Sequence, residues 1–140
     1  MKELISIIIP MYNEEESLPY LYDRLVKLAE NISNYNMEFL FVNDGSKDNS
    51  LEIVKQYRAN DSRVCYVNLS RNFGKEIAMA AALDYVKGDV VAIIDADLQD
   101  PPELIIDMLK YYEEGYDDVY AKRRSRKGET ALKKFTSHAF

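Results

Sequence analysis

The sequence predicts an α/β domain with three αβα layers and a mostly parallel sheet. Short apolar runs rich in β-branched residues alternate with longer stretches in which apolar residues recur every three or four positions. The length of 140 residues fits one domain, and 47% hydrophobic with 30% charged residues is typical of a chain with a packed core. Polar residues follow directly after the apolar runs, at the sheet edge where ligands bind in folds of this class.

Five short apolar runs are predicted as strands. The first ends at Pro10, and the second is closed by the turn sequence Asn43-Asp44-Gly45-Ser46. The fourth, Val90-Val91-Ala92-Ile93-Ile94, is apolar throughout, as expected of a strand buried on both faces. The predicted strands are residues 4–9, 37–42, 63–69, 90–94 and 118–121.

Helices are predicted between these strands and after the last one. Asp100, Pro101 and Glu103 suit the N-cap, the first and the third position of one of them. Beyond Glu129, the apolar residues fall on one face of an amphipathic helix. The predicted helices are residues 17–32, a segment around 51–57, 76–86, 101–114 and a last one from about 129.

Two carboxylates, Asp95 and Asp97, stand where the apolar run 90–94 ends. In an extended chain, residues two positions apart point to the same side, and Gln99 repeats that spacing. Hard oxygen ligands of this kind suit Mg²⁺ or Mn²⁺. The alternative is structural, because an Asp after a strand is often only a turn residue or a helix cap.

The ends of the predicted strands carry several more polar residues. Since the carboxyl ends of parallel strands meet at one edge, these residues are expected to converge there. The chain has neither the G-x-G-x-x-G dinucleotide fingerprint nor a P-loop. The converging residues are Tyr12, Glu14, Asp44, Arg71, Asp95, Asp97 and Gln99.

The net charge of −6 is distributed unevenly. Residues 1–121 carry 11 Lys/Arg and 23 Asp/Glu, or −12, whereas residues 122–140 carry 7 Lys/Arg and 1 Asp/Glu, or +6. A basic terminal segment favours an anionic partner such as phosphate groups or a membrane surface; a solvated basic helix without a partner is the alternative. The lone Cys65 excludes an intrachain disulfide, which fits a reducing compartment. No apolar run approaches the roughly 18 to 20 residues that span a bilayer, and no signal peptide is recognisable.

Four motifs occur in order along the chain. They are Ile9-Pro10-Met11-Tyr12-Asn13-Glu14, Asn43-Asp44-Gly45-Ser46, Arg71-Asn72-Phe73-Gly74-Lys75 and Asp95-Ala96-Asp97-Leu98-Gln99-Asp100-Pro101-Pro102-Glu103. Together they resemble the family 2 inverting glycosyltransferases of GT-A fold, within them the branch of dolichyl-phosphate mannose synthases and undecaprenyl-phosphate glycosyltransferases. The resemblance covers nearly the whole chain and implies a Rossmann-like, nucleotide-binding half of the GT-A fold.

The resemblance also implies roles for individual residues. Asp44 would contact the base, and Asp95 would lie near the ribose, the diphosphate or the metal. Asp97 and Gln99 would ligate a divalent cation, Mg²⁺ or Mn²⁺. Arg123, which cannot be distinguished from Arg124 or Arg126, would face a phosphate. The implied catalytic residues are Asp95, Asp97 and Arg123, and the implied substrate-binding residues are Pro10, Tyr12, Glu14, Asp44, Arg71 and Lys75.

Each of these residues also has a structural interpretation. Tyr12 covers the end of the first strand, and Glu14 is favoured in the first turn of a helix. Asp44 forms an Asx turn beside Gly45, and Lys75, like Arg71, is solvated surface. These readings explain the residues singly but not their joint position at one edge of the sheet.

The function implied by the resemblance is transfer of a sugar from a nucleotide diphosphate sugar, favoured as UDP-linked, to a polyprenyl phosphate with inversion. A phosphate acceptor is already anionic, so no strong base is needed, and the single His138 is treated as surface. The alternatives are a nucleotidyltransferase and a non-catalytic nucleotide-binding module. No nucleic-acid partner is expected.

The predicted organisation is a nucleotide-sugar-binding core at 1–121 and a basic amphipathic segment at 122–140 that begins an acceptor-binding or membrane-proximal part. Members of the resembled family are longer, so the chain is interpreted as an N-terminal fragment, and the basic run is a candidate membrane contact. The expected location is the cytoplasm, at the inner face of the membrane.

Overall fold

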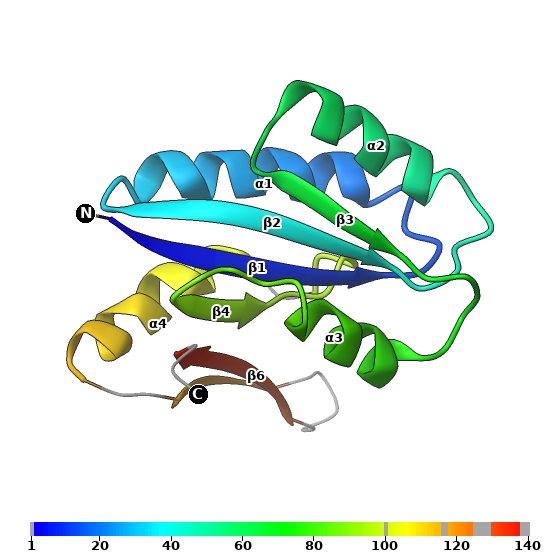
Figure 1. Ribbon diagram of the computed structural model, residues 1–140. Coiled ribbons are helices and arrows are strands. Elements are labelled where there is room, and N and C mark those ends of the chain that lie inside the picture. Colours follow the sequence, from blue (N-terminus) through cyan, green and yellow to red (C-terminus); the bar gives the residue numbers. More distant parts are fainter. Residues whose placement is uncertain (1, 100, 116–117, 125–129, 138–140) are drawn as a thin grey trace.

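The computed structural model describes residues 2–99, 101–115, 118–124 and 130–137, with side chains described up to residue 115. It forms one six-stranded sheet with four helices (Figure 1). The strands are β1 (Glu3–Met11), β2 (Tyr35–Asn43), β3 (Val64–Asn68), β4 (Val90–Ile93), β5 (Asp118–Arg124) and β6 (Thr130–Ser137). The helices are α1 (Leu18–Asn31), α2 (Ser50–Asn60), α3 (Lys75–Leu83) and α4 (Leu104–Glu113).

The strand order is β3-β2-β1-β4-β6-β5, and the first four strands of the chain are mutually parallel. The chain moves outward from β1 to β3 and then crosses back to β4 on the other side of β1. This order creates a switch point between β1 and β4, the position where open α/β sheets bind ligands. The predicted mostly parallel α/β class is confirmed.

The helices cover both faces of the sheet, with α1 and α2 on one side and α3 on the other (Figure 1). Successive residues of β1 supply opposite cores, as the period of two requires. Ile7 and Ile9 belong to the core shared with α1, α2 and α4, whereas Ile8 belongs to the core beneath α3. All three are fully buried, which explains why this strand reads as a continuous apolar run.

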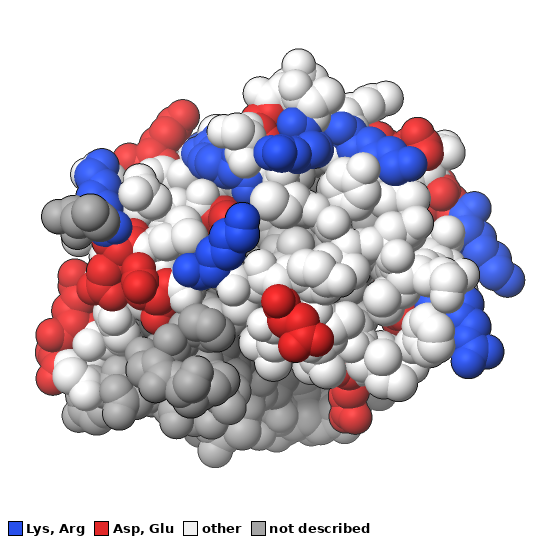
Figure 2. All heavy atoms as spheres, viewed as in Figure 1, with Lys and Arg blue, Asp and Glu red and all other residues white. Residues whose placement is uncertain are grey.

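Among the described helices, only α3 covers this face of the sheet (Figure 1). Its inner side is built from alanines, with Ala78 and Ala82 fully buried, so the helix packs close to the strands. Ile77 and Leu83 are 54% and 43% exposed. Figure 2 shows that charged side chains gather mainly around the margin of this view, whereas the surface over α3 carries few of them. Within the described residues, no helix combines the length and the apolar character needed to cross a membrane.

One prediction about the last segment is wrong: residues after Glu129 form a strand instead of a helix. β6 pairs antiparallel with β4, where Ala92 lies opposite Phe135, and with β5, where Arg123 lies opposite Ala131. The free edge of β4 offers a row of unpaired backbone groups, and pairing with it overrides a local helical pattern. The predicted boundary at residue 121 falls inside β5.

The start of α4 also differs from the prediction. The helix begins at Leu104 with Glu103 as its N-cap, three residues later than expected. The two prolines are followed by i to i+3 hydrogen bonds, from Leu104 N to Pro101 O and from Ile105 N to Pro102 O, 3.1 Å each. The chain therefore makes a tight turn before it enters the helix. Asp100, the predicted N-cap, lies outside the described residues.

Candidate functional site

A pocket of about 200 Å³ opens at the carboxyl ends of the parallel strands, between β1 and β4. This is the switch point of the sheet, and the loops after β1, β2 and β4 and the start of α3 form its walls. The lining residues are Pro10, Met11, Tyr12, Glu14, Asp44, Lys75, Asp95, Ala96 and Asp97. Seven of the nine belong to the set predicted from the sequence.

Hydrogen bonds tie the loop after β1 to the loop after β2. The amide of Asn13 donates to Ser46 Oγ at 3.0 Å, and its side-chain Oδ1 accepts from the amide of Lys47 at 2.8 Å. The amide of Glu14 donates to Ser50 Oγ at 2.9 Å. These contacts fix the direction in which the loop leaves β1, so Tyr12 and Glu14 face the pocket.

Asp44 joins the loop after β2 to the loop before α3. Its side chain is 5% exposed and accepts hydrogen bonds from the amides of Phe73 at 2.7 Å and Gly74 at 3.1 Å. Both carboxylate oxygens are thereby engaged by backbone donors, which holds the start of α3 against the pocket. A base in the predicted position could therefore donate only to the lone pairs of these oxygens that the two amides leave unused.

The same two loops are in backbone contact at Gly45, which has a φ of +74°. A Cβ built at this position would lie 2.3 Å from the amide nitrogen of Asn72 and 2.4 Å from the carbonyl carbon of Arg71. Only glycine satisfies both the left-handed backbone and the close approach. The glycine that suggested a turn in the sequence therefore also serves a contact between distant segments.

Ser17 connects the loop after β1 to the acidic loop after β4. Its Oγ lies 2.7 Å from the carbonyl oxygen of Ala96 and 2.8 Å from Oε2 of Glu14. Ser17 occupies the N-cap of α1 but makes no side-chain capping bond there. The hydroxyl that would ordinarily cap the helix instead holds the peptide between Asp95 and Asp97.

An ion pair between Lys75 Nζ and Asp95 Oδ1 connects the start of α3 to the acidic loop. With the three connections above, it closes a ring of contacts around the pocket, which we call the loop ring. The ring runs from the β1 loop to the β2 loop, then to the β3 loop with the start of α3, then to the β4 loop and back. Its four links are Asn13–Ser46, Asp44–Phe73/Gly74, Lys75–Asp95 and Ser17–Ala96.

Two non-glycine residues in the described part of the chain have a positive φ, and both lie in loops that flank the pocket. They are Asn13, with a φ of +53°, and Leu98, with a φ of +64°. Asn adopts this conformation readily, but a leucine there is unusual and costs of the order of 1–3 kcal/mol. Such conformations persist where surrounding contacts enforce them, and they cluster at functional sites.

The positive φ of Leu98 breaks the extended geometry assumed for the acidic loop. Ala96 is buried and Leu98 packs against the core, as the alternation predicted. Asp97 is exposed, and Gln99, whose amide donates to Asp97 Oδ1 at 3.1 Å, does not line the pocket. Beyond Leu98 the chain turns, so Gln99 stays beside Asp97 through its backbone amide but lies outside the pocket lining.

Divalent cations fit the chemistry of this pocket in part. Asp95 and Asp97 line it together and offer hard oxygen atoms. Within the described residues, no group of three or more His, Cys, Asp or Glu side chains is arranged to hold a metal ion. A cation bound here therefore needs further oxygen ligands from a bound molecule or from water.

Other predicted residues lie elsewhere. Arg71 does not line the pocket, and its guanidinium lies over the ring of Phe73, 4.7 Å from the centroid. Arg123 is in β5, and its side chain falls outside the described residues, as does the whole of His138. Ser17, Met11 and Ala96 were not predicted as part of the site. A serine just before a helix suggests a cap, so no local pattern indicated the contact of Ser17 with Ala96.

Comparison with known sequences gives consistent matches over nearly the whole chain. The profile of Glycosyl transferase family 2 matches residues 6–139. The "Uncharacterized glycosyltransferase YkcC" of Bacillus subtilis (strain 168) is 50% identical over 135 residues, which are 96% of this chain and 42% of that protein. The "Prophage bactoprenol glucosyl transferase homolog" of Escherichia coli (strain K12) is 40% identical over 136 residues, 97% of this chain and 44% of that protein. The chain spans about two fifths of the length of these relatives.

Comparison with solved structures confirms the predicted Rossmann-like GT-A architecture. TarS 1-349 of S. aureus in complex with UDP superposes with a TM-score of 0.66 at 30% identity, covering 81% of this chain and 32% of that one. Mannosyltransferase PcManGT from Pyrobaculum calidifontis, solved with GDP-Man and Mn²⁺, superposes with a TM-score of 0.72 at 21% identity, covering 89% and 37%. The second likeness concerns the fold.

Proposed function

This chain belongs to glycosyl transferase family 2, and we propose that it forms the donor-binding half of an enzyme that transfers a sugar from a nucleotide diphosphate sugar to a lipid phosphate. The observation that carries the proposal is the loop ring, which surrounds a pocket at the switch point of the sheet. Relatives named bactoprenol glucosyl transferase support a lipid acceptor.

The residues around the pocket divide the work of donor binding. Tyr12 and Asp44 lie toward β1 and β2, where the nucleoside would rest, while Asp95 and Asp97 follow β4 and would face the diphosphate. A divalent cation, Mg²⁺ or Mn²⁺, would be held by these two carboxylates and the donor phosphates, and would neutralise charge on the leaving diphosphate. Lys75 supplies a positive charge at the same place.

The transfer would proceed with inversion, by in-line attack of the acceptor phosphate on the anomeric carbon. A phosphate monoester is anionic at neutral pH, so the reaction needs orientation and charge stabilisation more than a strong base. Arg123, on β5, is proposed to face a phosphate of the donor or the acceptor. β5 and β6, which comprise residues 118–124 and 130–137, lie on the β4 side of the sheet.

A uridine nucleotide is the proposed donor moiety. The support is the Asp95–Glu103 pattern resembling bacterial members of the family, and the likeness to TarS, whose solved complexes contain UDP and UDP-GlcNAc. The competing hypothesis is a nucleotidyltransferase. Such enzymes usually carry a Gly-rich basic loop after the first strand, whereas the loop after β1 is acidic here. Product analysis separates the two: the transferase releases nucleoside diphosphate and the rival releases diphosphate. A non-catalytic module would release neither.

The experiment that tests the site is the binding of UDP with and without Mn²⁺ to wild type and Asp97→Ala. We expect Mn²⁺ to tighten UDP binding in wild type but not in the variant, with melting of the free variant unchanged or raised, because one of two neighbouring like charges is gone. Asp107→Ala is the matched control, since Asp107 is an exposed carboxylate on α4. An equal gain from Mn²⁺ in Asp97→Ala and wild type would place the metal elsewhere.

We further propose that residues 122–140 contact anionic lipid at the cytoplasmic face of a membrane. The support is the charge of +6 in this segment, because each basic residue near an anionic leaflet contributes about 1 kcal/mol. An amphipathic helix does not contribute to this contact, because Thr130–Ser137 is a strand. Co-sedimentation with phosphatidylserine vesicles at low and high salt tests the proposal. Binding that ignores salt, or that survives replacement of the basic residues by Gln, contradicts it.

A further inference from the structure

The pocket beside the acidic loop is lined by one basic side chain among the described residues. Lys75 faces four acidic residues that line the same small space. They are Glu14, Asp44, Asp95 and Asp97. Lys75 pairs with Asp95, and the two side chains are 52% and 23% exposed. The ammonium group therefore lies beside one of the two carboxylates that suit a divalent cation.

Two of the other acidic residues have partners that are held in place by the fold. Asp44 accepts from two backbone amides, and Glu14 is in contact with the Ser17 hydroxyl. Asp95 pairs with the side chain of Lys75, the first residue of α3. This helix covers the face of the sheet opposite to α1 and α2 (Figure 1). Because the stem of Lys75 is flexible, this link of the loop ring can be exchanged without moving the backbone.

A divalent cation and the Lys75 ammonium group compete for the same carboxylate. A metal ion bound to Asp95 would stand within a few ångströms of the ammonium group, and like charges at that distance repel strongly. A cation that binds alone must therefore break the Lys75–Asp95 pair, and the displaced ammonium group gains no new anionic partner. A nucleotide diphosphate arriving with the cation supplies phosphate oxygens, which lysine binds as a point charge.

We propose that Lys75 occupies the place of the cation beside Asp95 in the nucleotide-free protein, and that its ammonium group moves from Asp95 to the donor phosphates when nucleotide and metal bind together. The inference rests on the proposed function and adds a reason why metal and nucleotide depend on one another. Since such coupling is reciprocal, Lys75 weakens the binding of metal alone and strengthens the binding of nucleotide. A lysine that only contacted phosphate would leave the binding of metal alone unchanged.

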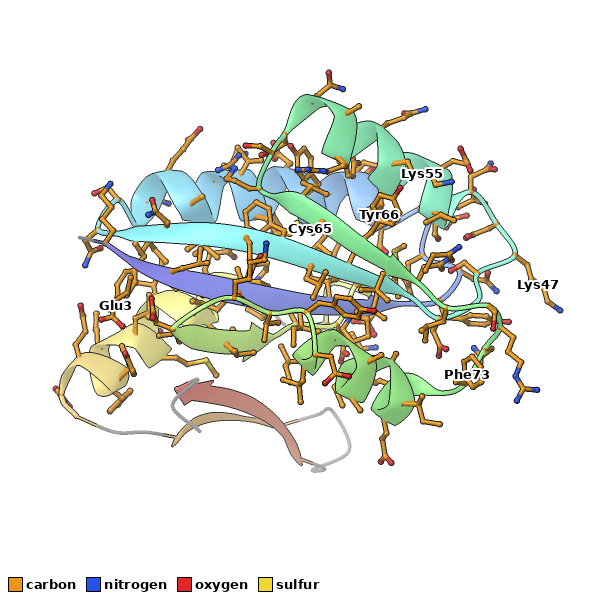
Figure 3. All side chains as sticks on the ribbon, viewed as in Figure 1. Glu3, Lys47, Lys55, Cys65, Tyr66 and Phe73 are labelled. Carbon is orange, nitrogen blue, oxygen red and sulfur yellow. The ribbon has the colours of Figure 1, made fainter. Side chains whose placement is uncertain are left out.

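The first measurement is the affinity for Mn²⁺ without nucleotide, by electron paramagnetic resonance of free Mn²⁺. Lys75→Met is expected to bind Mn²⁺ about fivefold or more tightly than wild type, within the usual range of such couplings. Lys75→Arg keeps the charge and is expected to stay near wild type. Lys47→Met is the matched control, because Lys47 lies in a loop of the ring but does not line the pocket, and its side chain points away from the body of the protein (Figure 3). Equal or weaker Mn²⁺ binding by Lys75→Met, with circular dichroism showing a folded protein, overturns the proposal.

The second measurement is the affinity for UDP without metal, by calorimetry. Lys75→Met is expected to bind UDP several-fold more weakly than wild type and Lys47→Met, so that one substitution moves the two affinities in opposite directions. Loss of UDP binding together with unchanged Mn²⁺ affinity overturns the exchange and leaves Lys75 as a phosphate contact only. Wild type that binds no UDP contradicts the proposed function, while the Mn²⁺ measurement still decides whether Lys75 occupies the cation's place.

Discussion

The Oγ of Ser17 lies 2.7 Å from the carbonyl oxygen of Ala96, although the two residues are 79 positions apart in the chain. Ala96 is the residue between the two carboxylates of the acidic loop, and Ser17 is the residue before α1. The contact joins the first and last of the four loops around the pocket. The position of Asp95 and Asp97 therefore depends on a hydroxyl group from the beginning of the chain.

Ser17→Ala is expected to reduce the gain in UDP affinity that Mn²⁺ provides, because the acidic loop loses its anchor. UDP affinity without metal should change little, and the free energy of unfolding should fall by about 1 kcal/mol, the usual contribution of one hydrogen bond. Calorimetry with and without Mn²⁺ measures the first effect, and urea denaturation measures the second. Ser17→Thr, which keeps the hydroxyl, should restore the gain. If Ser17→Ala keeps the full gain, the contact serves stability alone.

Asp44→Ala is expected to destabilise the fold, because two backbone amides lose their acceptor inside the protein. Hydrogen bonds to a charged group contribute about 1.5–3 kcal/mol each, so a loss of roughly 2–4 kcal/mol is expected after partial relaxation. Asp44→Asn keeps one acceptor oxygen and should lie between the variant and wild type. Urea denaturation gives the values, with Asp84→Ala as an exposed control on the end of α3. A loss below that of the control would show that the two amides find other partners.

Gly45→Ala is expected to cost more stability than Gly115→Ala. Both glycines have a positive φ, but a Cβ at Gly45 would meet backbone at 2.3 Å, whereas Gly115 has nothing within 4 Å. The backbone penalty of about 1 kcal/mol is common to both, and only Gly45 adds a clash between two loops. Thermal melting of the two variants isolates the cost of that approach. Equal destabilisation would mean that the β2 and β3 loops separate easily.

Acid should destabilise the protein partly through Asp61. Hydrogen bonds from Arg63 and Tyr22 lower the pKa of Asp61 to about 2, with the Arg63 contact as the largest cause. A carboxylate with a depressed pKa contributes stability above its ordinary pKa near 4 and loses that contribution as the pH falls toward 2. The expected contribution is roughly 1–2 kcal/mol, because Arg63 is partly exposed to solvent. Urea midpoints of wild type and Asp61→Asn at pH 7, 4, 3 and 2 measure it, and the two curves should converge in acid.

The hydrogen bond between Tyr22 and Asp61 also predicts a loss of stability at alkaline pH. Burial and the hydrogen bond to Asp61 raise the pKa of Tyr22 to about 12. The unfolded chain loses this phenolic proton at a lower pH than the folded one, so stability should fall as the pH rises from about 10 to 12. Tyr22→Phe should flatten this part of the profile. If the stability of Tyr22→Phe falls as steeply between pH 10 and 12 as that of wild type, other groups cause the alkaline loss.

The local pattern of the sequence was sufficient for the first five strands, β1 to β5, and for the acidic residues that follow β4. Asp95 and Asp97 could be predicted because an apolar run ends directly before them, and strand ends meet at one edge whatever the loops do. Arg71 was equally near a strand end but does not line the pocket. Its loop is directed by the backbone contact with Gly45 and by Asp44, which join segments far apart in the sequence.

The last strand shows why local periodicity fails at a sheet edge. The segment 130–137 is so short that its pattern of apolar residues fits a helix as well as a strand. The outcome depends on β4, which has an open edge until β6 pairs with it. Gln99 does not line the pocket for a different reason, because the positive φ of Leu98 turns the chain, and a leucine in the sequence gives no sign of that turn.

The strand order also has a consequence for the order in which the protein is made. Every residue that lines the pocket lies between Pro10 and Asp97, whereas the neighbour of β4 on its outer side comes from Thr130–Ser137. When α4 has left the ribosome, the nascent chain exposes the whole loop ring, while β6 is still inside the ribosome and the sheet is unfinished. A nucleotide that binds at that moment would stabilise the four parallel strands before β6 pairs with the edge of β4. The donor would then act on the growing chain as a template for folding, before it serves as a substrate.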